Sequence, residues 1–437
     1  MKKYLFIFGL VGTALFTACS TADDLITEKP IETTSDDQAK ETALILEAVQ
    51  DSEIPITLGI GQSRGYTRKP IDPTSVSGGY GIFSTETDEG RYLGVFCLAT
   101  DYQDENYTPI ENNWTDDDTG LLVRMNNVPA KVVNGDITFM NSDASATQKY
   151  YYPMGNWMKY NFYAYYPRRA TPDASLQITN NTVVEKNYEI DGSQDIIWGI
   201  ADPDHAISIS GVKPYCAKYF RDAKTAVYPS TDISAYLPQL KFEHKLVQFR
   251  FFVQAADAAT KGAGMKITNM FINNAISKLK LIVADKRVGS ANKNGDLRRG
   301  EDSDYRKKLN IKYVDPENKT VFTNADRFDT DGNGTLDTPY SINATGINVN
   351  TATPVGYIML PAPTISGLSE KYQLCLNYSM NNDVQQPEVM QVELEGTFEA
   401  GKIYNVLVTV KSPEEISATA ILQDWTTGST ITPSIVD

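Results

Sequence analysis

The segment of this chain whose residue types and spacing best suit a chemical task is the run of residues 329–337. It reads D-T-D-G-N-G-T-L-D, which places oxygen donors at its first, third, fifth and ninth positions and glycine at its sixth. A hard cation such as Ca²⁺ needs about six to eight converging oxygens, and an EF-hand-type loop supplies them at this spacing. The sequence therefore predicts a calcium site with the candidate ligands Asp329, Asp331, Asn333, Thr335 and Asp337. Because Tyr340 replaces the bidentate glutamate of such a loop, a solvated turn rich in Asp, Asn and Gly is the alternative interpretation.

A second chemical pattern, at residues 61–65, matches the G-x-S-x-G nucleophile elbow of hydrolases. That elbow needs a helix directly after the serine, whereas Pro70 follows closely and disfavours an early helix. His205 and His244 are the only histidines that could act as a base. The sequence has no P-loop, dinucleotide fingerprint or H-E-x-x-H motif. We therefore predict that the chain is not an enzyme.

The first nineteen residues have the composition of a secretory signal. Lys2 and Lys3 precede an apolar run at residues 4–16, and small residues lead to Cys19. Residues 1–18 are therefore predicted to be a signal peptide, since the run is too short to span a bilayer permanently. The cysteine resembles the acylated residue of bacterial lipoproteins, which predicts an outer-membrane lipoprotein at the cell surface or in a fimbrium. An ordinary signal peptide with an incidental cysteine is the alternative.

The bulk composition limits the partners. The 437 residues carry a formal net charge of −15 and no basic stretch, which argues against nucleic acid and leaves a lipid anchor as the only contact with membrane. Besides Cys19 the chain has Cys97, Cys216 and Cys375, with no C-x-x-C pair, so a zinc site is not expected and one disulfide stays open.

The elements that must position any site are predicted to be strands. Apolar and polar residues alternate in several segments with turn residues between them, and no long amphipathic helix intervenes. This pattern is typical of all-β antiparallel sandwiches. The strands are expected at residues 53–60, 132–139 (a hairpin at Asn134-Gly135), 160–166, 240–253, 402–410 and 416–422.

The chain is too long for one sandwich, which predicts two domains in tandem. A polar stretch at residues 19–50 reads as a flexible lipidated tether. The N-terminal sandwich is expected at residues 51–234 and the C-terminal one at 235–437, with a polar insertion at about 290–339.

Several short phrases, in this order along the chain, resemble the fimbrillin family of protease-matured (type V) pilus subunits. They are Y-Y-P at 151–153, Y-N-F-Y-A-Y-Y-P at 160–167, Q-D-I-I-W-G at 194–199, L-K-F-E-H-K-L at 240–246, G-Y-I-M-L-P at 356–361, F-E-A-G-K-I-Y at 398–404, and Trp425. The resemblance implies two transthyretin-like β-sandwich domains. It also implies a lipidated precursor whose N-terminal strand completes its own sheet until an arginine-specific protease removes it. A strand of another fimbrial subunit would then fill the groove by donor-strand exchange.

The chain has residues for each of these roles. The apolar residues that share one face of the N-terminal strand, and so form the predicted self-completing strand, are Ile54, Ile56, Leu58 and Ile60. Arg64 and Arg68 follow as candidate cleavage sites, although an uncut anchor or tip subunit would carry surface arginines there as well. Ile431 and Ile435, with Pro433 between them, mark a candidate donor strand.

We therefore expect a structural or adhesive subunit of a cell-surface fimbria. Its adhesion target is unknown from the sequence. A monomeric surface lipoprotein that binds glycan or a host protein is the alternative. The parity of His244 and the settings of Trp198 and Trp425 predict structural core roles for these residues.

Overall fold

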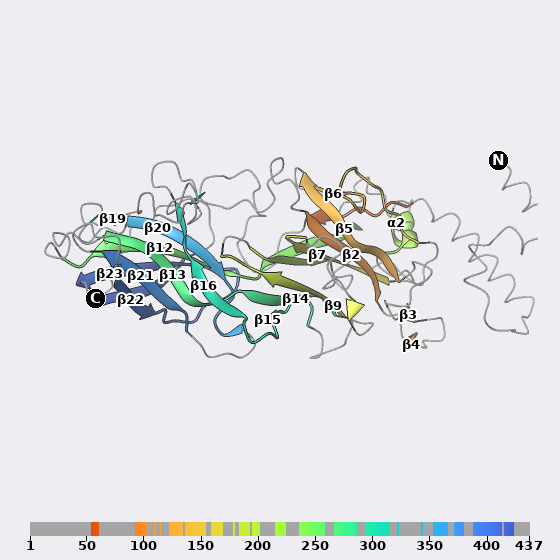
Figure 1. Cartoon of the computed structure of the whole chain (residues 1–437). Coiled ribbons are helices and arrows are strands. Elements are labelled where there is room, and N and C mark those ends of the chain that lie inside the picture. The colour runs from red at the N-terminus through yellow and green to blue at the C-terminus, as the bar shows by residue number, and fades with distance from the viewer. Residues whose placement is uncertain are drawn as a thin grey trace, which may run out of the picture.

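The computed structural model of the chain is almost entirely β-structure, which confirms the all-β prediction (Figure 1). It describes residues 54–60, 92–100, 102–103, 109–110, 114, 122–133, 136–153, 159–168, 178–179, 183–192, 195–201, 215–223, 236–257, 266–285, 293–314, 321–322, 342–343, 353–365, 371–379, 388–412 and 415–423. The one helix within these ranges is α2 (Ala217–Ala223). No helix in the described ranges combines the length and the apolar character that crossing a membrane would require.

Seven strands close into a barrel in the order β1-β11-β10-β7-β2-β5-β6. They are β1 (Gly59–Ile60), β2 (Leu93–Thr100), β5 (Val123–Val133), β6 (Asp136–Phe139), β7 (Lys159–Tyr166), β10 (Ile197–Ala201) and β11 (Gln239–His244). The predicted hairpin is confirmed as β5 and β6, with Val133 opposite Asp136. We use the name barrel core for the buried side chains of these strands and of α2, together with Ile56, Leu58, Tyr152, Tyr215 and Cys216.

Strand β7 has two buried faces. Tyr160, Phe162 and Tyr166 belong to the barrel core, whereas Tyr163 and Tyr165 point to a second cluster outside the barrel. A strand that is buried on both sides lacks regular apolar and polar alternation, which explains why aromatic residues occupy both faces of β7. The barrel wall therefore also serves as one boundary of the second core.

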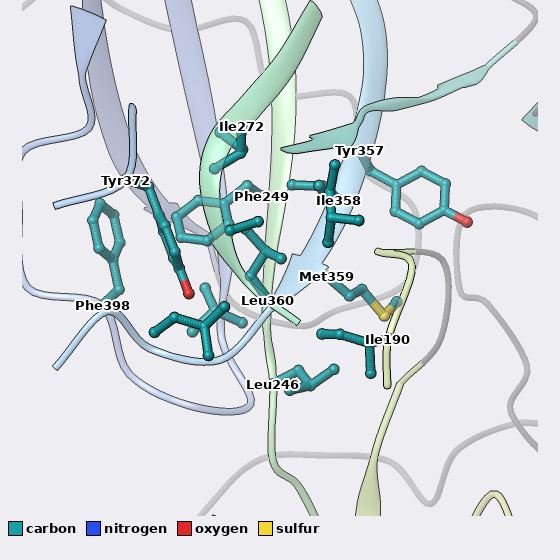
Figure 2. Close-up of a cluster of buried hydrophobic side chains, with 14 of the residues drawn as sticks. Ile190, Leu246, Phe249, Ile272, Tyr357, Ile358, Met359, Leu360, Tyr372 and Phe398 are labelled. Atoms are coloured by element: carbon teal, nitrogen blue, oxygen red, sulfur yellow. The ribbon is translucent and has the colours of Figure 1, made fainter. Parts of the chain in front are cut away.

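That second cluster, which we call the extended core, fills the space between two further sheets. One sheet has the order β18-β17-β20-β12-β23-β24, with β12 (Val247–Ala255), β17 (Lys312–Val314), β18 (Val321–Phe322), β20 (Thr353–Leu360), β23 (Ile403–Ser412) and β24 (Glu415–Gln423). The other has the order β16-β13-β21-β22, with β13 (Lys266–Ile276), β16 (Arg306–Asn310), β21 (Gln373–Ser379), β22 (Glu388–Glu393) and, beside β13, β19 (Ile342–Asn343). Figure 2 shows part of this core, where the ring of Phe249 meets that of Phe398 edge to face at 4.9 Å between centroids.

A smaller sheet lies between the barrel and these two sheets (Figure 1). Its order is β15-β14-β9-β8, with β8 (Ile178–Thr179), β9 (Val183–Glu189), β14 (Lys278–Asp285) and β15 (Leu297–Arg299). A short pair, β3 (Tyr102–Gln103) and β4 (Pro109–Ile110), stands apart. Since β9 and β14 come from distant parts of the chain, their pairing ties the N-terminal strands to the C-terminal ones.

The structure corrects several details of the predicted organisation. The predicted strand at 240–253 is split into β11 and β12, which lie in different sheets. The chain therefore changes sheets after His244, and the predicted boundary at residues 234 and 235 precedes this change because β11 pairs with β10 and β1. The pairings of β1 with β11 and of β12 with β23 are parallel, so the sheets are not wholly antiparallel.

Residues 293–314, which lie in the predicted polar insertion at about 290–339, contain β15, β16 and β17. Leu309 and Ile311 from this stretch are buried in the extended core. The charged residues that gave the stretch its polar composition are paired at the surface, as in the 2.6 Å contact between Lys280 Nζ and Glu301 Oε1.

Candidate assembly site at the barrel-closing segment

Residues 54–60, the closing segment, complete the barrel. Its last two residues form β1, which pairs in parallel with β11 through Gly59 opposite Gln239 and Ile60 opposite Leu240. The other edge of β1 is antiparallel to β6, with Gly59 opposite Asp136. Without β1 the described strands would form an open sheet with two facing edges.

The first half of the segment is held by backbone hydrogen bonds to residues 150–152. The Ile56 amide donates to the Tyr150 carbonyl at 2.8 Å, and the Tyr152 amide donates to the Ile54 carbonyl at 3.0 Å. The Gly59 amide then donates to the Pro238 carbonyl at 3.0 Å. Pro55 lies between these two residues in an antiparallel bridge with Tyr151, and its missing amide hydrogen removes neither of these hydrogen bonds.

Side chains of the segment alternate between core and solvent. Ile56 and Leu58 are 4% and 2% exposed and belong to the barrel core, and Ile54 and Ile60 are partly buried against it. Pro55 and Thr57 are exposed. This is the period of two of a strand with one face on a core. The structure thus brings the four predicted apolar residues together on one side.

The wall behind the segment is aromatic. Tyr152 is 2% exposed, and its ring stacks on that of Phe220 at 5.1 Å between centroids. Its hydroxyl makes no hydrogen bond within the described ranges, and burial raises the pKa of this phenol well above its usual value. Phe220 comes from α2, which was not among the predicted elements. The spacing of Tyr215, Tyr219 and Phe220 on one helical face was the available signal.

The surroundings of the closing segment are apolar. Burial raises the pKa of the Cys97 thiol in the barrel core, which disfavours a reactive thiolate. Within the described ranges no three His, Cys, Asp or Glu residues come together as a metal site would require. What the closing segment contacts is an apolar slot with backbone donors and acceptors at its rims, which is what a β-strand needs.

Other predicted site residues lie outside the described ranges. They are the lipidation residue Cys19, the cleavage candidates Arg64 and Arg68, the donor-strand residues Ile431 and Ile435, and the calcium ligands Asp329, Asp331, Asn333, Thr335 and Asp337. The tether at 19–50 and Trp425 also lie outside them.

The structural roles predicted for two residues are confirmed. His244 is 6% exposed, and its Nδ1 forms a hydrogen bond with Asp195 Oδ2. Trp198 is 6% exposed in the extended core, and its indole nitrogen donates to the Val283 carbonyl at 2.8 Å. Cys97, Cys216 and Cys375 are buried and free, so the disulfide that the sequence left open does not form among them.

No protein-family model and no curated protein matches the sequence. Among solved structures, a fimbrial protein from Bacteroides vulgatus is similar at 13% identity and a TM-score of 0.46, over 85% of this chain and 99% of that one. A protein from Bacteroides uniformis that is described as a putative cell adhesion protein matches at 13% identity and a TM-score of 0.42, over 85% of this chain and 99% of that one. The tip fimbrial protein Mfa3 from Porphyromonas gingivalis matches at 10% identity and 0.33, over 77% and 95%. At these values the likenesses assign no role to this chain.

Proposed function

We propose that this chain is a structural or adhesive subunit of a cell-surface fimbria, delivered as a lipoprotein acylated at Cys19. In this proposal it joins other subunits after proteolysis removes the closing segment, and a strand of another subunit takes the vacated place. The observation that carries the proposal is the closing segment itself, which completes a barrel with two strand residues while inserting its apolar face into the core. Fimbrial proteins are also among the solved structures to which this chain is similar.

The free energy that the closing segment contributes by burial is large enough to favour its replacement by another strand. Burial of Ile56 and Leu58 stabilises the barrel by about 1.5–3 kcal/mol each, and Ile54 and Ile60 add a part of that. The total is comparable to the whole stability of a small domain, which is about 5–15 kcal/mol. Removal of the segment would also leave the rims at Tyr150, Tyr152 and Pro238 without these backbone partners. The open slot would therefore strongly favour a replacement strand.

The C-terminal tail of another copy has the sequence for that replacement. Residues 56–60 read I-T-L-G-I, and residues 431–435 read I-T-P-S-I. Alignment of Ile431 with Ile56 and of Ile435 with Ile60 keeps both isoleucines on the core side. It places Pro433 at the position of Leu58, while the described amide donors of the closing segment are Ile56 and Gly59. Proline therefore fits this register, whereas a shift of two residues toward Ile54 would put it where Ile56 donates.

Cleavage after Arg64 or Arg68 would free the segment from the rest of the barrel strands. Both arginines follow Ile60 closely, and an exchange then needs no further break in the chain. After the cut, only the contacts described above hold the segment in its slot.

The test is the binding of a fluorescent peptide that spans residues 426–437 to the chain before and after cleavage by an arginine-specific protease. We expect fluorescence anisotropy to show that the peptide binds to the cut chain alone. A peptide that carries both Ile431→Asp and Ile435→Asp should not bind.

A Thr432→Glu peptide is the matched control, because Thr432 aligns with the exposed Thr57. Equal binding to the uncut chain would contradict the exchange. Persistence of the acylated Cys19 terminus on surface-extracted protein would favour the monomeric lipoprotein.

A further inference from the structure

The five-stranded sheet of the C-terminal half has two edge strands, β22 and β16, whose charged residues differ in sign. Strand β22 pairs with β21 over its whole length without a register shift, and β16 pairs with β13. Within the described ranges neither strand pairs with a further strand on its other edge, although β24 lies close to β22 across the sandwich. An edge strand of this kind offers a row of backbone donors and acceptors to another chain.

Strand β22 lacks the usual protection of an edge. Its sequence E-V-M-Q-V-E contains no lysine and no proline, and its pairing shows no bulge. Val389 is 59% exposed, the most exposed large hydrophobic side chain of the described ranges. Gln391 and Glu393 are exposed on the same face. This edge is therefore suited to pairing with a further strand.

Charge decides which strand fits. Strand β22 ends in Glu393 and contains no basic residue. Strand β16 begins with Arg306, Lys307 and Lys308, so a symmetric antiparallel pairing of two β16 strands sets Lys308 opposite the Lys308 of the other copy, and like charges in that position are destabilising. The basic strand β16 and the acidic strand β22 therefore complement each other, whereas two β16 strands repel each other.

Direction and register agree with this match. Successive strands of the sheet are antiparallel, so β16 and β22 run in opposite directions. A second copy that continues the sheet would therefore present its β16 antiparallel to β22, as the ladder requires. Leu309 points into the extended core, which puts Lys308 and Asn310 on the outer face. When Glu393 lies opposite Lys308, Gln391 lies opposite Asn310 on that face.

The contacts that Glu393 and Lys308 make within one chain compete only weakly with a contact between two copies. Glu393 Oε2 lies 3.1 Å from Lys371 Nζ, but both side chains are about half exposed, and such pairs contribute little. Lys308 Nζ lies 3.8 Å from the centroid of the Phe271 ring, which belongs to the neighbouring strand β13. Both groups can turn to a neighbouring chain without leaving a buried charge unpaired.

We propose that β22 of one copy of this chain pairs with β16 of a second copy and continues the five-stranded sheet. The two surfaces differ, so the contact is head-to-tail and does not close on itself. This contact is separate from the closing segment, because none of its residues belongs to the barrel core.

The test is sedimentation velocity of the full chain, purified with Cys19→Ser to prevent acylation and with the closing segment in place, so that strand exchange cannot occur. We expect association that grows with protein concentration and weakens with salt, since exposed charges are screened. Glu393→Lys and Lys308→Glu should each raise the dissociation constant by about tenfold, a difference of about 1.4 kcal/mol. The chain that carries both changes should recover wild-type association, because the swap rebuilds the opposite-charge pair between copies.

Lys371→Gln is the matched control. It removes the ion pair of Glu393 within the chain and leaves the edge charge in place, so association should be retained. Failure of the double variant to recover, full association of Glu393→Lys, or a monomeric wild type at all concentrations would each overturn the proposal. None of these results depends on whether the closing segment is ever removed.

Discussion

Ile56 and Leu58 show how much of the candidate site can be predicted from individual residues. Their alternation with Pro55 and Thr57 was enough to predict which side chains share a face, and the structure places those chains in the barrel core. The partners of that face were not predictable. Tyr152, Phe220 and Leu240 are far apart in the sequence, and no local pattern shows that they line one slot. Asp195, the hydrogen-bond partner of His244, is also far from it along the chain.

A charge at Ile56 tests the residue scale. Ile56→Asp would bury a carboxylate that has no partner in the barrel core, and such a change costs several kcal/mol. We expect the uncut chain to misfold or to melt at a much lower temperature, as measured by circular dichroism. Thr57→Asp is the control, because Thr57 is exposed and the same charge should leave the melting temperature nearly unchanged. A wild-type melting curve for Ile56→Asp would show that the segment does not complete the barrel.

At the scale of elements, periodicity was reliable and composition was not. The hairpin of β5 and β6 and the paired strands β23 and β24 lie close to where alternation predicted them. Strand β16 was missed because its Arg-Lys-Lys start reads as a solvated loop, while Leu309 alone points inward. A strand with one face in solvent can carry many charges on that face, so a high density of charged residues does not exclude a strand.

The calcium loop is a prediction at this scale, because the ligands must come from one turn. We expect isothermal titration of millimolar CaCl₂ into the metal-free chain to release heat with a dissociation constant in the range of extracellular modules, about 10⁻⁴–10⁻³ M. Asp329→Asn combined with Asp331→Asn should abolish that heat. Asp326 is a candidate for the carboxylate that Tyr340 cannot supply, and Asp326→Asn tests that role through the change in the dissociation constant. No heat from the wild-type chain would remove the site and leave an ordinary polar turn.

On the scale of the whole molecule, the sheet of β9 and β14 has the largest consequence. The extended core runs from Tyr165 and Trp198 on the barrel wall, through Leu281 of β14, to Phe249 and Val406 between the C-terminal sheets. The indole of Trp198 bonds to the Val283 carbonyl across the same junction. Two sandwiches in tandem were predicted from length and strand count, but nothing local in the sequence indicated that they share a core.

A shared core predicts one cooperative unfolding event. Leu281 is fully buried in β14, so Leu281→Ala should destabilise the chain by about 2–5 kcal/mol. Unfolding in urea can be followed separately by tryptophan or amide probes in the barrel and by probes in the C-terminal sheets. We expect the midpoint of denaturation to fall by the same amount for both sets of probes. Val389→Ala is the control, since this side chain is mostly exposed and its loss should change the midpoint little. Separate shifts at the two ends would show that they unfold independently.

The parallel pairing of β1 with β11, beside an antiparallel β6, has a final consequence. A slot with one parallel rim and one antiparallel rim accepts a guest in a single orientation, since a reversed strand would meet the wrong hydrogen-bond pattern on both sides. Subunits joined through such slots would all face the same way. A fibre of them would then have a polarity, with an empty slot at one tip and an unused tail at the other, so that elongation and capping would take place at different ends.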